Sequence, residues 1–153
     1  MSGIANYTTS VEWRKSVSEI IGMLASARAS HLMQEFDGAG NVTAVAFKIK
    51  TPHGELAFHL PCETQKAMQV LQNQYAAGKI RRGYSNDANH ARNVAWRILR
   101  HWLEAQLALV EIGQVTVEQV FLPYVQNSEG KTLYEVMLAN RFQQYTLCER
   151  SES

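Results

Sequence analysis

Hydrophobic positions recur at helical spacing near the start of the chain and again over a long stretch of its second half. The first stretch follows a Thr-x-x-Glu sequence at Thr9, which is typical of a capping box, and predicts a helix over residues 10–28. The second stretch predicts a helix over residues 87–112, which Gly113 ends. On the first helix, the charged side chains expected to face solvent are Arg14, Lys15 and Glu19.

Hydrophobic and polar residues alternate between these two helices, which is typical of strands with one buried face. The alternation is clearest over residues 42–50 and 55–60, and residues 32–36 give a shorter and weaker first strand. Turns rich in Gly, Asp and Pro at 37–41 and 51–54 separate the three segments. The pattern therefore predicts a three-stranded antiparallel meander with one apolar face.

Helical spacing returns after the strands. Residues 62–76 predict a helix, and a polar loop over 78–86 follows it. Two more capping boxes begin at Thr116 and Thr132, where a Gln or Glu stands three residues further on. The first predicts a short helix and the second a final helix that reaches about Tyr145.

Strands grouped between helices predict an α+β fold, a single domain over residues 1–153 with frayed ends at 1–8 and 149–153. We expect the meander to pack against the long helix 87–112. Trp96 lies beside the apolar stripe of that helix and is expected to be half-buried. The side chains expected to share the core are Ile21, Val45, Phe47, Phe58, Leu60, Ile98, Trp102 and Leu109.

Composition supports one compact domain. The 153 residues are 46% hydrophobic with a net charge of +1, which excludes an intrinsically disordered chain. No apolar run approaches the roughly 18 residues that span a bilayer, and residues 1–16 lack the features of a secretory signal. With only two cysteines, Cys62 and Cys148, we expect a cytoplasmic protein without membrane association and without a disulfide framework.

Several short strings are distinctive in combination. They are Ala95-Trp96-Arg97, Trp102–Gln106, Val120–Tyr124 and Thr132–Glu135, together with Thr51–Phe58 further upstream. In these strings the chain resembles a family of small uncharacterised proteins encoded by bacteriophages and prophages. The resemblance implies a phage-related protein in a bacterial host cytoplasm, and it implies no activity and no functional residue.

Motifs of catalysis and cofactor binding are missing from the sequence. The five histidines show no paired spacing typical of a zinc site, and His53 and His59 alone would supply too few ligands. Phosphate-binding glycine motifs and nucleophile elbows are absent as well. Cys62 follows Pro61 at a predicted helix start, where a helix dipole lowers a thiol pKa, but a small apolar role is favoured. We therefore expect no enzyme, no metal and no cofactor.

Charged residues are distributed unevenly along the chain. Residues 76–101 carry six basic side chains against one acid, whereas residues 102–130 carry four acids and no Lys or Arg. Lys and Arg neutralise phosphates, and aromatic rings such as Tyr75, Tyr84 and Trp96 can stack on unpaired bases. We therefore expect a phage-type accessory protein that binds DNA or RNA non-specifically. The predicted binding residues are Lys79, Arg81, Arg82, Tyr84, Arg92, Arg97 and Arg100, with Lys48 and Lys50 on the outer sheet face.

Two alternatives remain open at this point. Arg97, Arg100 and Glu104 are expected on the solvent face of the long helix, where Arg100 and Glu104 can form an ion pair. In this alternative, these charges belong to an ordinary solvent-exposed helix face and bind no nucleic acid. The chain could instead be a protein-binding or self-assembling accessory factor that acts on a host protein, a phage protein or a small nucleotide. The basic and acidic segments could then pair between copies in a homo-oligomer, with an apolar interface at Phe121, Leu122 and Tyr124.

Overall fold

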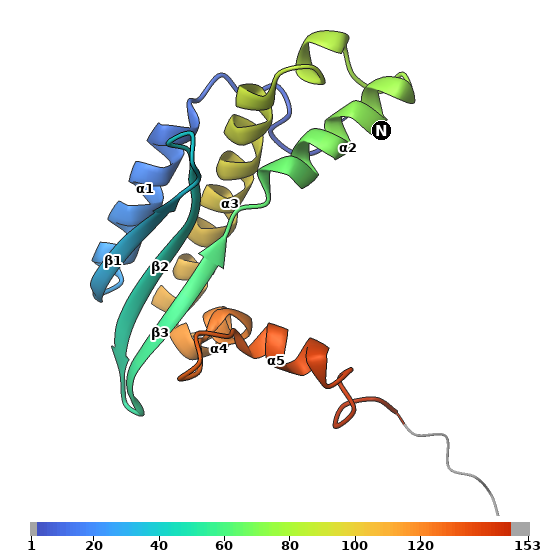
Figure 1. The fold of residues 1–153 in the computed structure, drawn as a ribbon. Coiled ribbons are helices and arrows are strands. Elements are labelled where there is room, and N and C mark those ends of the chain that lie inside the picture. The colour runs from blue at the N-terminus through green and yellow to red at the C-terminus, as the bar shows by residue number, and fades with distance from the viewer. Residues whose placement is uncertain (1–2, 148–153) are drawn as a thin grey trace, which may run out of the picture.

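A three-stranded antiparallel sheet, covered on one face by two helices, forms the body of the protein in a computed structural model that describes residues 3–147 (Figure 1). The elements in chain order are α1 (Trp13–Ser26), β1 (Ala29–Phe36), β2 (Val42–Thr51), β3 (Gly54–Pro61), α2 (Thr64–Ala76), α3 (Ala88–Glu111), α4 (Val117–Phe121) and α5 (Leu133–Ala139). Single 3-10 turns stand at Arg82–Tyr84 and Leu122–Tyr124. The predicted α+β class and the meander are confirmed, and the predicted frayed end at 149–153 lies outside the described residues.

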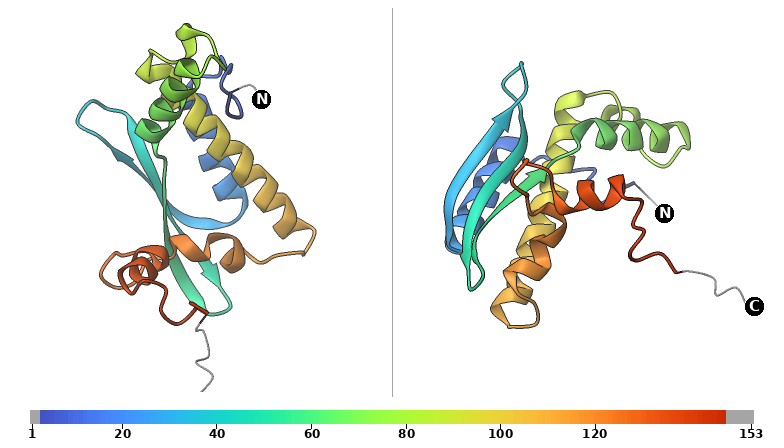
Figure 2. Two further views of the ribbon diagram at one scale, coloured as in Figure 1. Left: turned by 90° about the vertical axis from the view of Figure 1, so that its right-hand side faces the viewer. Right: turned by 60° about the horizontal axis from the view of Figure 1, so that its bottom comes forward.

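The register of the sheet explains the alternating sequence pattern. Leu32, Phe47 and Phe58 are direct cross-strand neighbours on the face that the helices cover. The rings of Phe47 and Phe58 stack with their centroids 5.3 Å apart. Met33 and His59 lie on the opposite face, either side of β2. In the right view of Figure 2 the sheet forms one layer, and α1 and α3 lie on the same side of it.

The main core lies between the sheet, α1 and α3. Trp96 is fully buried there, whereas Trp102 is only half-buried, so the predicted placement of these two side chains is wrong. In the structure α3 packs against both α1 and α2, so its buried side includes Trp96 and Leu103 and is turned away from the stripe that the sequence shows. Ile98 and Leu109 on α3 and Ile21 on α1, which we also expected in the core, are half-buried.

A second, smaller apolar cluster lies where α2 crosses the start of α3. Its buried members are Leu71, Ile80, Ala91 and Val94. Ile4 and Tyr7 pack against this cluster, and the Ile4 amide donates to Oε1 of Gln74 at 3.0 Å. Ile4 and Tyr7 thus attach the segment before α1 to this cluster, within the range 1–8 for which the sequence predicted a frayed end.

The start of α1 also differs from its prediction. The Thr9 hydroxyl accepts from the Val11 amide at 3.1 Å, so it closes a local turn and does not cap the helix. The helix begins at Trp13, whose amide donates to Oδ1 of Asn93 on α3 at 2.8 Å. A contact across the fold thus replaces the predicted capping box. The two boxes predicted at Thr116 and Thr132 are both present.

The C-terminal segment returns to the sheet and then leaves it. The Gln126 amide donates to the carbonyl oxygen of Ala57 at 2.8 Å, and Val125 bridges to Phe58 at the free edge of β3. Helix α5 follows, and none of its residues is buried. In Figures 1 and 2 this helix points away from the sheet and from α3.

Candidate nucleic-acid interface

The loop after α2 presents three basic side chains to solvent. Gly78, with φ of 73°, ends α2, and the amides of Gly78 and Lys79 donate back to the Tyr75 and Gln74 carbonyls at 2.9 Å. Ile80 is 8% exposed and fixes the loop to the smaller cluster. Its neighbours Lys79, Arg81 and Arg82, which we call the basic loop, are exposed. Within residues 3–147 none of the three forms an ion pair.

An open hollow of about 510 Å³ lies beside the basic loop. Tyr7 and Thr8 line it together with Lys79, Arg81 and Tyr84. The rings of Tyr7 and Tyr84 meet edge to face at 5.4 Å. The N-terminal segment thus contributes to this site. Sequence reasoning missed that contribution, because only the folded chain brings residues 7 and 84 together.

The ring of Tyr84 is less accessible for stacking on a base than the sequence indicated. Its ring is half-buried and lies 5.4 Å from the His90 ring, while Nε2 of His90 donates to the Tyr7 carbonyl oxygen at 2.6 Å. Trp96 is fully buried and cannot stack on a base. Tyr75, 45% exposed, is the remaining aromatic side chain of the predicted set with an open ring face.

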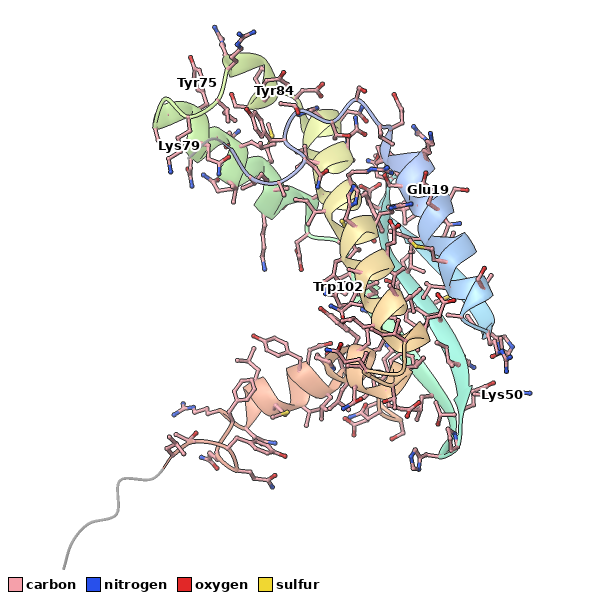
Figure 3. All side chains as sticks on the ribbon, turned by 180° about the vertical axis from the view of Figure 1, so that it is seen from behind. Glu19, Lys50, Tyr75, Lys79, Tyr84 and Trp102 are labelled. Atoms are coloured by element: carbon pink, nitrogen blue, oxygen red, sulfur yellow. The ribbon has the colours of Figure 1, made fainter. Side chains whose placement is uncertain are left out.

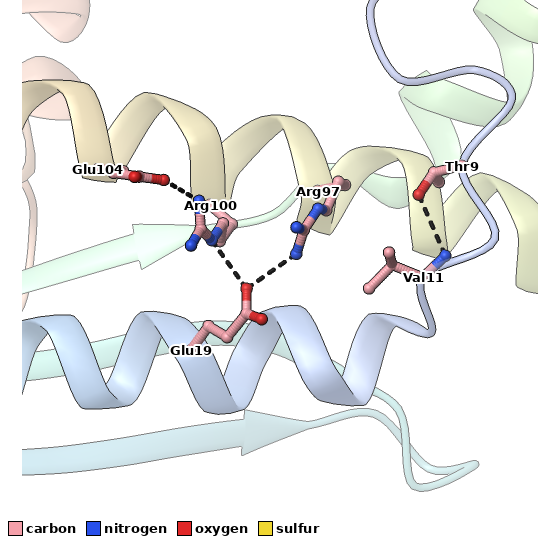
Figure 4. A network of polar contacts seen from close by, with 6 residues as sticks. All are labelled: Thr9, Val11, Glu19, Arg97, Arg100 and Glu104. Atoms are coloured by element: carbon pink, nitrogen blue, oxygen red, sulfur yellow. Dashed lines mark hydrogen bonds and ion pairs between the residues drawn. The ribbon is translucent and has the colours of Figure 1, made fainter.

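Arg97 and Arg100 lie on the side of α3 that faces α1, not on a solvent face. Both donate to Oε2 of Glu19 at 2.8 Å, and Arg100 also pairs with Glu104, as predicted (Figure 4). The expectation that Glu19 faces open solvent is wrong, because its carboxylate joins the two helices. The charges of Arg97 and Arg100 are therefore largely neutralised within the fold.

The pKa of Glu19 reflects this network. Burial raises the pKa, but the hydrogen bonds and positive charges of Arg97 and Arg100 outweigh burial and hold it below its ordinary value. A carboxyl group whose pKa is lowered on folding stabilises the folded state at neutral pH. That stabilisation is lost as the pH falls through the lowered pKa.

We expect Glu19→Gln to lower the free energy of unfolding by about 1 kcal/mol at neutral pH. The difference from wild type should shrink as the pH falls, because the wild-type carboxyl group also becomes neutral. Urea unfolding at pH 7 and at pH 3 measures this, with Glu111→Gln as a control at an exposed carboxylate of α3. A difference that stays constant over the two pH values would contradict the ion-pair interpretation.

The remaining predicted basic residues are separated from the loop. Arg92 is half-buried on α3 and lies near enough to Asp37 to help lower the pKa of that carboxyl, after the hydrogen bonds from Asn41 and Ala39. Lys48 and Lys50 are exposed on β2. Figure 3 shows Lys50 and Lys79 at opposite ends of the molecule. The residues predicted to form one nucleic-acid site therefore lie in separate parts of the fold. Of these residues, the three of the basic loop form a compact exposed group.

The predicted apolar interface is mostly part of the core. Phe121 is fully buried, with its ring centroid 5.1 Å from that of Phe47 and 5.6 Å from that of Phe58. Tyr124 is half-buried against Trp102, and Leu122 alone is exposed, at 51%. The expectation that Phe121 could serve as an interface anchor is therefore wrong. The sequence could not separate the two roles, because both favour an aromatic residue.

Cys62, His59 and Glu35 are the other side chains whose chemistry could serve a site. Burial raises the pKa of the Cys62 thiol to about 12, and the Glu63 carboxylate adds to the rise, so the expected effect of a helix start is overcome. Nε2 of His59 lies 2.7 Å from Oε2 of Glu35. Across residues 3–147, no group of three or more His, Cys, Asp or Glu side chains is placed to hold a metal ion.

The fold and the basic loop together define an α+β protein with an exposed cationic site beside a small apolar cluster. Comparison with protein-family models, with curated proteins and with solved structures gives no match to this chain. Among residues 3–147, no helix has both the length and the apolar character that crossing a membrane requires.

Proposed function

We propose that this protein is a small phage-type accessory protein that binds nucleic acid without sequence selectivity through its basic loop. The observation that carries the proposal is the exposure of Lys79, Arg81 and Arg82 on three closely spaced positions, with no carboxylate paired to them among residues 3–147. Unpaired cations on a short loop can each contact a phosphate and release its counterions. No base-reading motif accompanies them, so contacts to the backbone dominate.

The packing around the loop supports this role. Ile80 is buried between the exposed basic residues, which limits the conformations over which the cations must be ordered when they bind. Tyr75 is the aromatic side chain placed to stack on an unpaired base, since Tyr84 packs against Tyr7 and His90. DNA and RNA, single- or double-stranded, fit this chemistry equally.

We expect labelled oligonucleotides to bind at 50 mM salt and to lose about 10- to 40-fold in affinity at 200 mM, as two or three phosphate contacts would. Replacing Arg81 and Arg82 by Ala should weaken binding at low salt and reduce the slope of log affinity against log salt by about 2 for a duplex. Fluorescence anisotropy with single- and double-stranded oligonucleotides measures both quantities.

A matched control is available on the sheet. Lys48→Ala with Lys50→Ala removes the same charge from β2, where Lys50 lies at the opposite end of the molecule from Lys79 (Figure 3), and should leave the salt slope nearly unchanged. An equal loss of affinity in the two double variants would show that net charge alone drives binding. If neither oligonucleotide binds at 50 mM salt, the proposal fails.

The second candidate is a self-assembling or protein-binding accessory factor. It is favoured by the exposed apolar side chains at the C-terminal end, where Leu122, Tyr134 and Leu138 are each more than half exposed. Helix α5 carries two of them and makes its main contacts with the neighbouring turn at Leu122–Tyr124. A chain that binds no oligonucleotide but sediments as an oligomer would favour this candidate over the first.

A further inference from the structure

A hollow separate from the one beside the basic loop lies where β3 meets the C-terminal segment. Its volume is about 530 Å³, and its walls are mainly apolar. Pro61 and Pro123 form part of the walls with the rings of Tyr124 and Tyr134. The Tyr124 ring is 6.1 Å from that of Trp102, and the Tyr134 ring 6.0 Å from that of Phe142, so a second aromatic side chain supports each wall.

The charge of this hollow is negative. Glu63 and Glu135 line it, and no Lys or Arg is among its lining residues. Hydrogen bonds from the Thr132 hydroxyl and amide lower the pKa of Glu135, and burial opposes them only in part, so this carboxylate is ionised at neutral pH. Lys131 is nearby, but its ammonium lies at 4.0 Å from the Glu129 carboxylate.

A second hollow of about 370 Å³ adjoins the first, and the two share His59, Pro61 and Glu63. Glu35 and Asp37 line the second hollow, which also lacks Lys and Arg. The hydrogen bonds to Asn41 and Ala39 lower the pKa of Asp37. The pair of hollows therefore forms one acidic surface, with aromatic walls at the end near α5.

We infer that this acidic double hollow binds a segment of a partner polypeptide that carries two basic side chains. An aromatic wall beside a carboxylate suits a guanidinium group, which stacks on the ring and donates hydrogen bonds to the oxygens. One arginine would enter between Tyr124, Tyr134 and Glu135, and the second would face Glu63. Glu35 lies in the same hollow, with its Oε2 already 2.7 Å from Nε2 of His59. Nucleic acid is repelled from this surface, so the site is separate from the basic loop and does not depend on the proposed function.

The probes are capped peptides with two arginines separated by one to three residues, titrated into the full-length, ¹⁵N-labelled chain and followed by amide shifts at Thr132 and Tyr134. Matched peptides with citrulline keep the shape of arginine and remove its charge. We expect the arginine peptides to shift these signals and the citrulline peptides to bind at least tenfold more weakly. Equal binding of both peptides, or no shift at these signals, would overturn the inference.

Variants test the residues without disturbing the fold. Glu135→Gln keeps a residue that can complete the capping box at Thr132 and should weaken the arginine peptide about 5- to 10-fold. Glu111→Gln is the control and should leave affinity unchanged. Tyr134→Phe should retain affinity and Tyr134→Leu should lose about 2- to 10-fold, because only the former keeps a ring face. Equal affinity of the arginine peptide for all of these variants would show that it does not bind at Glu135 and Tyr134, and would overturn the inference.

Two further measurements distinguish other occupants. Butylguanidine, a single guanidinium on a short alkyl chain, should bind at least tenfold more weakly than the two-arginine peptide, and equal affinity would point to a small molecule and overturn the assignment to a polypeptide. Sedimentation of the wild-type chain and of Glu135→Gln tests for a second copy in the hollow. If the wild-type chain self-associates and Glu135→Gln abolishes that self-association, the occupant is a second copy, and the assignment to a different partner is overturned.

Discussion

Phe121→Ala is expected to lower the free energy of unfolding by about 3–5 kcal/mol, the range found when a buried phenylalanine is truncated. The ring is fully buried and contacts Phe47, Phe58 and Trp102, so its loss leaves a cavity lined by three aromatic side chains. A loss of this size is a large share of the stability of a typical small domain. Chemical denaturation of the purified variant measures it.

The neighbouring residue provides the control. Leu122 is half exposed, and Leu122→Ala should change the free energy of unfolding by no more than about 0.5 kcal/mol. If both substitutions had the same small effect, the segment Val117–Tyr124 would not be part of the main core. Because the Phe121 variant is destabilised, it cannot report on assembly, and tests of a C-terminal interface should use exposed residues.

The Cys62 thiol is expected to react with iodoacetamide about 1000-fold more slowly in the folded protein than a thiol with a pKa of 9.0 would at the same pH. The reason is that the thiolate is the reactive form and that burial raises the pKa to about 12. Cys148→Ser leaves Cys62 as the only cysteine, and mass spectrometry then follows a single modification.

Unfolding the same variant in urea provides the comparison, since the thiol should then regain ordinary reactivity. Fast modification of the folded variant would contradict the burial of this side chain. The raised pKa also has a consequence at high pH. The unfolded chain releases the thiol proton more readily than the folded chain does, so the free energy of unfolding should fall as the pH rises from about 9 towards 12.

The order and type of the main elements could be predicted from the sequence because each depends on local patterns. The period-two alternation of β2 and β3 and the capping boxes at Thr116 and Thr132 need no information from distant residues. The burial of individual side chains was predicted less well. Trp96 and Trp102 are separated by less than two helical turns, and the contact between α1 and α3 decides which of them is fully buried.

The candidate site shows the same division between local and long-range information. The exposed basic loop follows from the short polar segment that Gly78 begins. The neutralisation of Arg97 and Arg100 depends on Glu19, which is 78 and 81 residues away in the chain. The contribution of Tyr7 depends on a contact of the same kind. Sequence patterns find charges, but a carboxylate that approaches from another element decides whether a charge is available.

The division of the apolar interior into two clusters has a consequence for local opening. The smaller cluster of Leu71, Ile80, Ala91 and Val94 supports the basic loop and residues 3–8, while the sheet belongs entirely to the larger one. A region with few buried contacts exchanges its amide hydrogens through local openings that cost less than global unfolding. Helix α2 and the basic loop can therefore open as a unit while α1 and the three strands stay folded, and the amide hydrogens of α2 should exchange faster than those of the sheet.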